Sequence, residues 1–221
     1  MRIATYNIQS ADYGKSVKAI QKEITDLGVN IIGIQEIDNM TNRSGKVNIL
    51  TDICGKDFNY CEYAATMEFD GGHYGIGIAS KYPMKLIKTV KHKTADLEPR
   101  VLMICEVNVD GQTLYVANTH LSYENTEIRK EQFQTIAEEL KKYSPVVLFG
   151  DFNVSSFEEY SVVPLNKVNN QNNRMNSFKG PIAFPSIDNI LYDDNVEVIE
   201  TRLNESDSSD HNLIWANIKI K

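Results

Sequence analysis

Residues 29–37 read Val-Asn-Ile-Ile-Gly-Ile-Gln-Glu-Ile, an apolar run that closes on a carboxylate. A short run of this kind is typical of a strand buried on both faces of a sheet. Apolar residues recur at spacings of three and four from Val17 to Leu27, before Gly28, and predict an amphipathic helix. Residues 3–8, Ile-Ala-Thr-Tyr-Asn-Ile, predict a strand ahead of that helix, so the chain opens with a strand–helix–strand unit.

The same arrangement recurs in the middle of the chain. Residues 115–120, Tyr-Val-Ala-Asn-Thr-His, predict a strand, and the apolar residues between Ile128 and Leu140 predict a second amphipathic helix. The run from Pro145 to Phe149 predicts another buried strand. We interpret the two units as an approximate duplication of architecture rather than of sequence.

Further strands are predicted by β-branched and apolar stretches between turn residues, at 74–80, 86–90, 101–109, 112–117, 187–192, 196–201 and 213–220. No linker rich in Gly, Pro or Ser divides the chain, so we expect a single domain over residues 1–221. The polar residues 166–177 are the one long loop expected. The pattern favours an α/β fold with two mostly antiparallel or mixed sheets packed face to face and helices outside, a four-layer α/β/β/α sandwich.

Composition and charge limit the classes of protein. The 221 residues carry 23 Lys and Arg against 30 Asp and Glu, a net charge of −7, and exclude a disordered or collagen-like chain. The negative charge argues mildly against binding nucleic acid by bulk electrostatics, while a local patch with a cation stays open. The chain shows no signal pattern and no apolar stretch long enough to cross a membrane. We expect a cytoplasmic monomer without stable membrane insertion.

The three cysteines are Cys54, Cys61 and Cys105. Their number is odd and their spacing is not that of metal ligands. We therefore expect buried free thiols rather than a disulfide framework.

Polar side chains end the strands of both units: Asn7 and Glu36 in the first, His120 and Asp151 in the second. Parallel strands joined by right-handed crossovers bring their carboxyl ends to one edge, where open sheets bind ligands. The sequence therefore predicts that these four side chains meet at a site.

The acids and amides among these residues suit a hard cation. Asp151 and Asn153 stand two residues apart in Gly-Asp-Phe-Asn, where strand alternation would turn both to one side, although a simple turn is an equal alternative. Glu36 ends an apolar strand, and a carboxylate at risk of burial needs a partner or a metal. Glu36, Asp151 and Asn153 form an oxygen-rich set with Asn7 and Asp210, and Mg²⁺ favours such ligands. The Cys and His spacing of zinc sites is absent.

Two of the four histidines stand beside such acids. His120 ends a strand, and His211 follows Asp210 just before the C-terminal strand. We expect catalytic roles for these two and structural roles for His73 and His92.

Eight short motifs follow one another from the first strand to the last: Tyr6-Asn7, Ile34-Gln35-Glu36, Tyr74-Gly75-Ile76-Gly77, Glu98-Pro99-Arg100, Asn118-Thr119-His120, Gly150-Asp151-Phe152-Asn153, Ser186-Ile187-Asp188 and Ser209-Asp210-His211. In this order they resemble the endonuclease/exonuclease/phosphatase superfamily, which includes DNase I-like nucleases, exonuclease III-type repair enzymes, sphingomyelinases, inositol polyphosphate phosphatases and deadenylases. Each motif alone is unspecific, but the ordered set covers nearly the whole chain.

The resemblance implies a DNase I-like four-layer sandwich that hydrolyses phosphate esters with Mg²⁺ or Mn²⁺. It implies that Glu36 is the principal metal ligand, with Asn7 and Asp210 beside it. Arg100 could supply a fixed charge to the phosphate, with a surface ion pair as an equal alternative.

The resemblance also implies roles for the remaining side chains. Asp151 would orient or deprotonate the attacking water, and Asn153 would fix that carboxylate and a phosphate oxygen. His211, paired with Asp188, would contact the phosphate, and His120 would lie near the leaving group. Whether Asp151 or the pair of Asp188 and His211 is the base stays open.

The leading expectation is a divalent-metal-dependent phosphodiesterase, a nuclease that cleaves DNA or RNA by in-line attack of an activated water. The alternatives are a phosphatase or phosphodiesterase for a small-molecule or lipid phosphate ester, and a non-catalytic binding module with the same fold. Gln9 and Asn189 depart from the superfamily's pattern, which argues against a second metal and a DNA-repair specificity. The lysines between Lys81 and Lys93 could follow a nucleic-acid backbone, but a solvated strand face is favoured.

Overall fold

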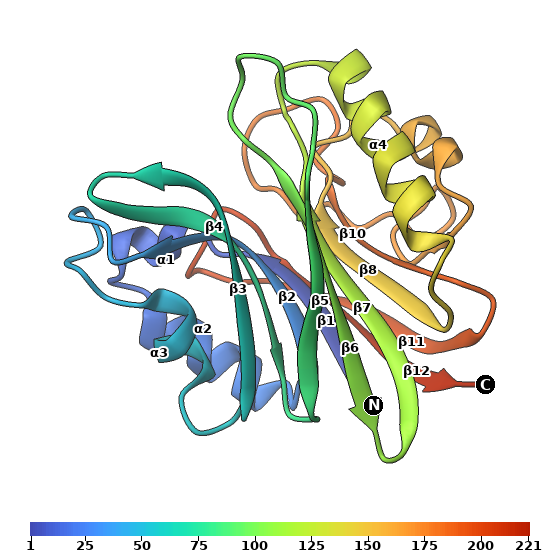
Figure 1. The fold of residues 1–221 in the computed structure, drawn as a ribbon, viewed down its shortest axis with the longest axis horizontal. Coiled ribbons are helices and arrows are strands. Elements are labelled where there is room, and N and C mark those ends of the chain that lie inside the picture. The colour runs from blue at the N-terminus through green and yellow to red at the C-terminus, as the bar shows by residue number, and fades with distance from the viewer.

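A computed structural model describes residues 1–221 and contains two six-stranded sheets (Figure 1). The first sheet has the order β11 (Val196–Asn204), β12 (Leu213–Ile220), β1 (Arg2–Asn7), β2 (Ile31–Asn39), β4 (Gly72–Ser80) and β3 (Tyr60–Phe69). The second has the order β5 (Met84–Lys91), β6 (Val101–Val109), β7 (Gln112–His120), β8 (Val146–Asp151), β10 (Asp188–Tyr192) and β9 (Asn166–Lys167). Each sheet has one parallel pair at its centre, β1 with β2 and β7 with β8, and its other pairs are antiparallel.

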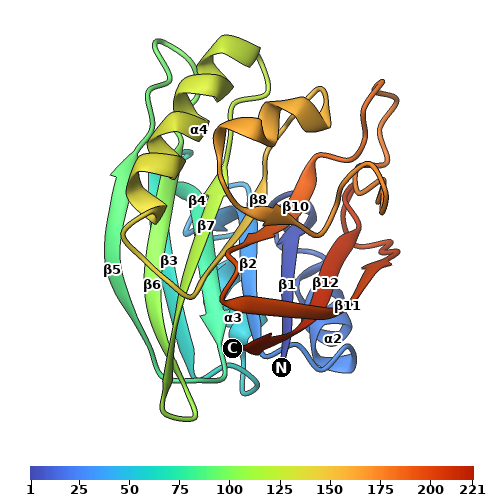
Figure 2. The ribbon, with the colours of Figure 1, turned by 90° about the vertical axis from the view of Figure 1, so that its right-hand side faces the viewer.

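Helices cover the outer face of each sheet (Figures 1 and 2). The short turn α1 (Ser10–Tyr13), α2 (Val17–Asp26) and α3 (Ile49–Cys54) lie outside the first sheet. Outside the second lie α4 (Thr126–Leu140) and a 3₁₀ helix at Phe157–Val162. None of the helices is both long enough and apolar enough to cross a membrane. The predicted four-layer α/β/β/α sandwich with mixed sheets is confirmed.

Three hydrophobic cores lie between the four layers, and strand alternation explains how one strand serves two of them. On β8, Val147 and Phe149 pack between the sheets, whereas Val146 and Leu148 pack against α4. The core under α2 and α3 contains apolar residues of β2, Ile32 among them. This two-sided burial is what the apolar runs of β2 and β8 predicted.

The strands and long helices predicted from the sequence are confirmed, with ends that differ by a few residues. The predicted loop 166–177 contains the two-residue strand β9, which pairs with β10. Four further elements were not predicted: α1, α3, β3 and the 3₁₀ helix. β3 is partly exposed along most of its length, so it lacks the period-2 pattern of a half-buried strand, and α3 is only six residues long.

One expectation about the cysteines was wrong. Cys54 at the end of α3 and Cys61 in β3 form a disulfide. Both elements are among those that the sequence pattern missed, so their proximity could not be anticipated. Cys105 is a buried free thiol, as expected, and burial raises its pKa to about 12.

Candidate active site

The ends of the two parallel strand pairs meet between the sheets. Asn7 ends β1, and its side-chain amide donates hydrogen bonds of 2.9 Å to both Glu36 on β2 and Asp151 on β8. Parallel pairing sets His120, the last residue of β7, beside Asp151. Antiparallel pairing sets Asp188, the first residue of β10, on the other side of Asp151. The expected meeting of strand ends is therefore present, and Asn7 links the two sheets there.

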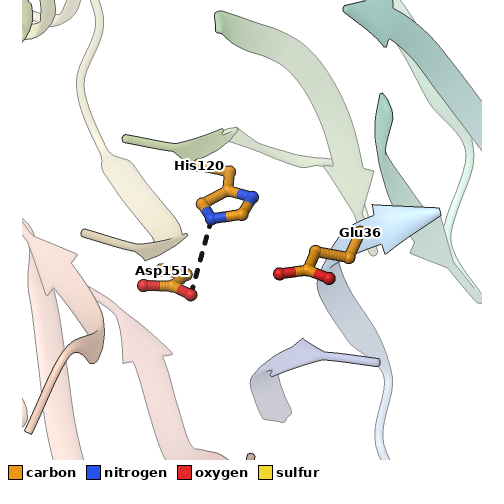
Figure 3. A group of neighbouring side chains, drawn as sticks. All are labelled: Glu36, His120 and Asp151. Carbon is orange, nitrogen blue, oxygen red and sulfur yellow. Dashed lines mark ion pairs between the residues drawn. The ribbon is translucent and has the colours of Figure 1, made fainter. Parts of the chain in front are cut away.

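Glu36 reaches the site because β2 is irregular at this point. The register of β2 against β4 shifts between Ile34 and Ile37, and Glu36 takes a left-handed conformation with φ of 59°. Such a bulge re-aims a side chain and is frequent beside active sites. Figure 3 shows the Glu36 carboxylate directed toward His120 and Asp151, which approach each other to 3.6 Å. Glu36 stays half-buried, so its carboxylate can meet a ligand from solvent.

Asp151 is almost completely buried and lies among other ionisable groups. The backbone N–H of Asn153 donates to its Oδ1 at 3.0 Å, and the Asn153 side chain donates to the carbonyl of Leu121. Burial and the neighbouring Asp188 carboxylate raise the pKa of Asp151 to about 7, against the opposing effects of His211 and Asn7. A carboxyl with this pKa can exchange a proton near neutral pH.

His211 lies against Asp188, with 2.7 Å between Nδ1 and the carboxylate Oδ2. Burial opposes protonation of the imidazole, but the carboxylates of Asp188, Asp151 and Asp210 outweigh it and raise the pKa of His211 to about 10. Its Nε2 lies 3.8 Å from Asp151 and 3.9 Å from Asp210. His211 is therefore an imidazolium at neutral pH, with Nε2 directed toward the acids.

His120 has the opposite electrostatic environment. Its Nδ1 lies 2.8 Å from Nη1 of the buried Arg100, which also pairs with Glu98 at 3.1 Å. Burial and the positive charges of Arg100 and His211 lower the pKa of His120 well below its ordinary value. A neutral His120 accepts the Arg100 hydrogen bond through Nδ1, which leaves a proton on Nε2, the nitrogen nearest Asp151.

A cavity of about 570 Å³ opens over these residues. Seven of the predicted site residues line it: Glu36, Arg100, His120, Asp151, Asn153, Asp210 and His211. The other two lie behind this lining and hold it in place, Asn7 against Glu36 and Asp188 against His211. All nine predicted side chains are therefore brought together.

The cavity also contains residues to which sequence reasoning gave no role. Tyr74 and Glu98 stand in motifs quoted above and line its polar side. An apolar wall comes from loops: Tyr123, Val154, Phe178, Ile182, Ala183, Phe184 and Ile187. No periodic pattern marks these loop residues, and the Pro-flanked Ala-Phe-Pro before Ser186 was the only local signal.

The chemistry of the polar side fits a hard divalent cation. Ligand atoms of Glu36, His120 and Asp151 lie within 4.8 Å of one another, and those of Asp151, Asp188 and His211 form a second such group. Asp188 also has a buried Oδ1 without a hydrogen-bond partner. Clustered carboxylates that repel each other gain stability from a cation between them.

The residues expected to hold the metal differ in how they face the cavity. Glu36 and Asp210 line it, and the Gln9 side chain donates to Asp210 at 3.0 Å. Asn7 faces Glu36 with its N–H, while its Oδ1 accepts from the Gln9 backbone at 3.0 Å. In this arrangement Asn7 positions a carboxylate rather than presenting an oxygen to the cavity.

A second, smaller cavity of about 220 Å³ adjoins the first, because Glu36, Tyr74 and Glu98 line both. Its other lining residues are Gln9, Ser10, Tyr13, Arg43, Met67 and Phe69. Five consecutive residues from Gln9 to Tyr13 have φ between 45° and 55°, so α1 is a left-handed turn. This conformation costs roughly 1–2 kcal/mol per residue.

The left-handed turn is held by an ion pair between the exposed Arg43 and the buried Asp38. Arg43 donates to both oxygens of Asp38, at 2.6 and 2.7 Å, and to the hydroxyl of Ser10 at 3.0 Å. Ser10 in turn donates to Asp38 at 3.2 Å. Strained backbone of this kind persists only where surrounding contacts fix it, and such strain concentrates at functional sites.

The lysines between Lys81 and Lys93 line neither cavity. Lys85 pairs with Glu106, Lys88 with Glu139 and Lys93 with Glu131. The first two of these lysines lie on β5, an outer strand of the second sheet. This arrangement agrees with a solvated strand face.

A family model described as the Endonuclease/Exonuclease/phosphatase family matches residues 4–211. The chain belongs to this family. The family includes phosphodiesterases, nucleases and phosphatases, and it generally depends on a divalent metal ion. This chain is therefore an enzyme, a phosphoesterase of this family.

Solved structures share the fold at low identity. An endonuclease/exonuclease/phosphatase from Beutenbergia cavernae has a TM-score of 0.79 at 16% identity and covers 100% of this chain and 71% of its own. A mannosyl-6-phosphatase from Bacteroides thetaiotaomicron has a TM-score of 0.73 at 15% identity and covers 100% of both chains. D. rerio TDP2, complexed with a single-strand DNA product, has a TM-score of 0.72 at 17% identity and covers 99% of this chain and 98% of its own. No curated protein sequence matches the chain significantly.

Proposed function

We propose that this enzyme of the family hydrolyses a phosphodiester with Mg²⁺ or Mn²⁺, by in-line attack of a water that Asp151 activates. The observation that carries the proposal is the buried Asp151 between a charged His211 and a neutral His120, in one cavity with Glu36. A phosphodiester is anionic and repels hydroxide, so its hydrolysis needs a base, fixed positive charge and a cation together.

Glu36 and Asp210 are the proposed carboxylate ligands of the cation. Asn7 would hold Glu36 in place or turn its own oxygen to the ion. When bound, the ion supplies charge neutralisation for the phosphate oxygens and the leaving oxygen.

Asp151 rather than the pair of Asp188 and His211 is the proposed base. His211 is already protonated at neutral pH because its pKa is raised to about 10, so it cannot accept the proton of water. A charged imidazole held by Asp188 can instead bind a phosphate oxygen. Asn153, whose backbone N–H holds Asp151, would complete the contact with phosphate through its side chain.

His120 and Arg100 act together in this proposal. Arg100 fixes the ring of His120 and keeps it neutral with the proton on Nε2. That proton is available to a leaving oxygen. Arg100 also adds one fixed positive charge to the cavity, although Glu98 and His120 already occupy its Nη1.

The proposed chemistry suits both nucleic acid and a small phosphate ester, so both are candidate substrates. TDP2, which shares the fold, is complexed with a single-strand DNA product, and this favours a nuclease. The Bacteroides enzyme with the same fold is a mannosyl-6-phosphatase, and this favours a small monoester as the second candidate.

A substrate panel tests the proposal. The purified protein is incubated with Mg²⁺ or Mn²⁺ and bis(p-nitrophenyl) phosphate, plasmid DNA, RNA or inositol phosphates, with and without EDTA. We expect hydrolysis of the diester that EDTA abolishes. Cleavage of monoesters alone, or a rate that EDTA does not change, would contradict the proposal.

A further inference from the structure

Resting on the proposed function, we propose that the active site has two ester compartments. Its substrate is then a small phosphodiester that carries one uncharged apolar or aromatic group on each side of the phosphate. The larger cavity would hold one group against its apolar wall, and the smaller cavity would hold the other.

The first support is the position of the acids relative to the two cavities. Glu36, Tyr74 and Glu98 line both, whereas His120, Asp151 and His211 line only the larger. A phosphate next to Glu36 is therefore at the boundary, with space on either side. A monoester has a single organic group and would leave one of these spaces unused.

The second support is the apolar surface at the rim of each cavity. Ile182 and Tyr123 are 46% and 66% exposed at the larger cavity, and Tyr13 is 51% exposed at the smaller one. Exposed large apolar side chains that gather around a cavity mark ligand-binding surface. The smaller cavity adds the aromatic ring of Phe69, and the Arg43 guanidinium lies 4.5 Å from the centre of that ring.

The third support is the absence of spare positive charge. No lysine lines either cavity, and the only two arginines are already paired, Arg43 with Asp38 and Arg100 with Glu98. A second phosphate on the substrate would meet the carboxylates of Glu36 and Glu98 without a free cation. The lysines between Lys81 and Lys93 cannot substitute, because they line neither cavity. These charges favour a short diester over a polynucleotide, whose phosphates need a row of cations.

The left-handed turn gives the smaller cavity its shape. Gln9, Ser10 and Tyr13 all belong to this turn, and all three line the cavity. A right-handed path through these residues would direct the three side chains elsewhere. Because three of the five residues in this strained turn line the cavity, the strain supports a binding role for the compartment.

The test measures binding of diphenyl phosphate, methyl phenyl phosphate and phenyl phosphate by isothermal titration calorimetry in EDTA, which keeps the esters intact during the titration. Two occupied compartments predict that wild type binds diphenyl phosphate at least about tenfold more tightly than methyl phenyl phosphate, because the second ring is also buried. Tyr13→Ser in the smaller cavity and Ile182→Ser in the larger should each reduce this ratio to below about threefold. Tyr60→Ser and Ile199→Ser are matched controls, because both residues are exposed and line neither cavity. Met67→Ser and Tyr123→Ser serve as second variants, and circular dichroism verifies the fold.

Several results would overturn the two compartments. In the wild type, these are an affinity ratio of diphenyl phosphate to methyl phenyl phosphate below about twofold, or tighter binding of phenyl phosphate than of diphenyl phosphate. In the variants, they are a ratio that falls only when one of the two cavities is changed, or a ratio that falls equally in the controls. If bis(p-nitrophenyl) phosphate is not hydrolysed, the proposed function fails, while the calorimetry still decides between one compartment and two.

Discussion

In the first strand–helix–strand unit, β1–α2–β2, the carboxylate that reaches the cavity is the half-buried Glu36. In the second, β7–α4–β8, the corresponding groups are His120 and Asp151, and both are almost completely buried. Both units have a parallel strand pair and a helix on the outer face. The same topology therefore places an accessible carboxylate, Glu36, at the end of one unit and two buried titratable groups, His120 and Asp151, at the ends of the other.

The difference has a local cause in each unit. The bulge in β2 directs the half-buried Glu36 into the open cavity, whereas β8 continues regularly to Asp151 between its neighbours β7 and β10. Regular pairing on both sides places His120 and Asp188 next to Asp151, and burial then shifts its pKa. One strand irregularity is enough to divide the work, with a cation proposed at the first unit and proton transfer at the second.

The largest expected effect is loss of turnover in the second unit. Asp151→Ala removes the proposed base, and His211→Ala removes the proposed phosphate contact. Each should lower kcat by at least about 10²-fold on the active substrate while the protein stays folded. Steady-state kinetics measures this, with Asp96→Asn as an exposed control. Near-normal rates in both variants would falsify the proposed roles.

The corresponding variant of the first unit should change the need for metal. Glu36→Gln keeps the shape of the side chain but removes its charge. We expect the Mg²⁺ concentration for half-maximal activity to rise at least about tenfold, as for loss of a ligand or its support. Asp151→Ala should raise this concentration by a smaller factor, and the exposed Glu197→Gln is the control. If Glu36→Gln and Asp151→Ala raised the required Mg²⁺ concentration equally, the proposal that the first unit binds the cation and the second transfers the proton would be wrong.

Stability should respond to pH in the sense opposite to an ordinary salt bridge. The pKa of Asp151 is about 7 in the folded protein and 3.8 ordinarily, so its ionisation costs stability as the pH rises from about 4 to about 7. In EDTA, Asp151→Asn should therefore raise the free energy of unfolding at pH 8 by at least about 1 kcal/mol, and by less at pH 4. Asp188→Asn should instead destabilise, because it leaves the buried His211 charge without its partner. Urea unfolding at the two pH values decides, and a loss of stability in Asp151→Asn at pH 8 would contradict the assignment.

The sequence predicted the strand ends well because the strands that carry the site are buried on both faces. Short apolar runs rich in Ile and Val, such as those of β2 and β8, are typical of buried strands, and the polar residue that closes each run marks its end. The convergence of Asn7, Glu36, His120 and Asp151 then followed from strand direction. The exposure that separates Glu36 from Asp151 did not follow, because a bulge of one residue leaves no pattern in the sequence.

The apolar wall and the smaller cavity could not be predicted for another reason. Ile182 and Phe184 lie in a loop, and Tyr13 lies in a left-handed turn made of ordinary L-residues rather than glycine. Such positions depend on contacts between distant segments, such as Arg43 with Ser10. The disulfide between Cys54 and Cys61 was missed likewise, because neither α3 nor β3 has a clear pattern.

The smallest expected effect concerns the place where the two units touch. A Cβ added at Gly33 in β2 would lie 2.4 Å from the Cβ of Phe149 in β8, so the sheets must separate or Phe149 must move. Gly33→Ala should lower the free energy of unfolding by about 1–3 kcal/mol, the usual cost of an overpacked core. Phe149→Leu makes room for the added methyl group, but on its own it leaves a cavity. The double variant should therefore lose less free energy of unfolding than the two single variants together, by at least about 0.5 kcal/mol. Additive losses in urea unfolding would show that this contact does not set the sheet separation. Other contacts between the sheets would then have to set the distance between Glu36 and Asp151, which Asn7 bridges.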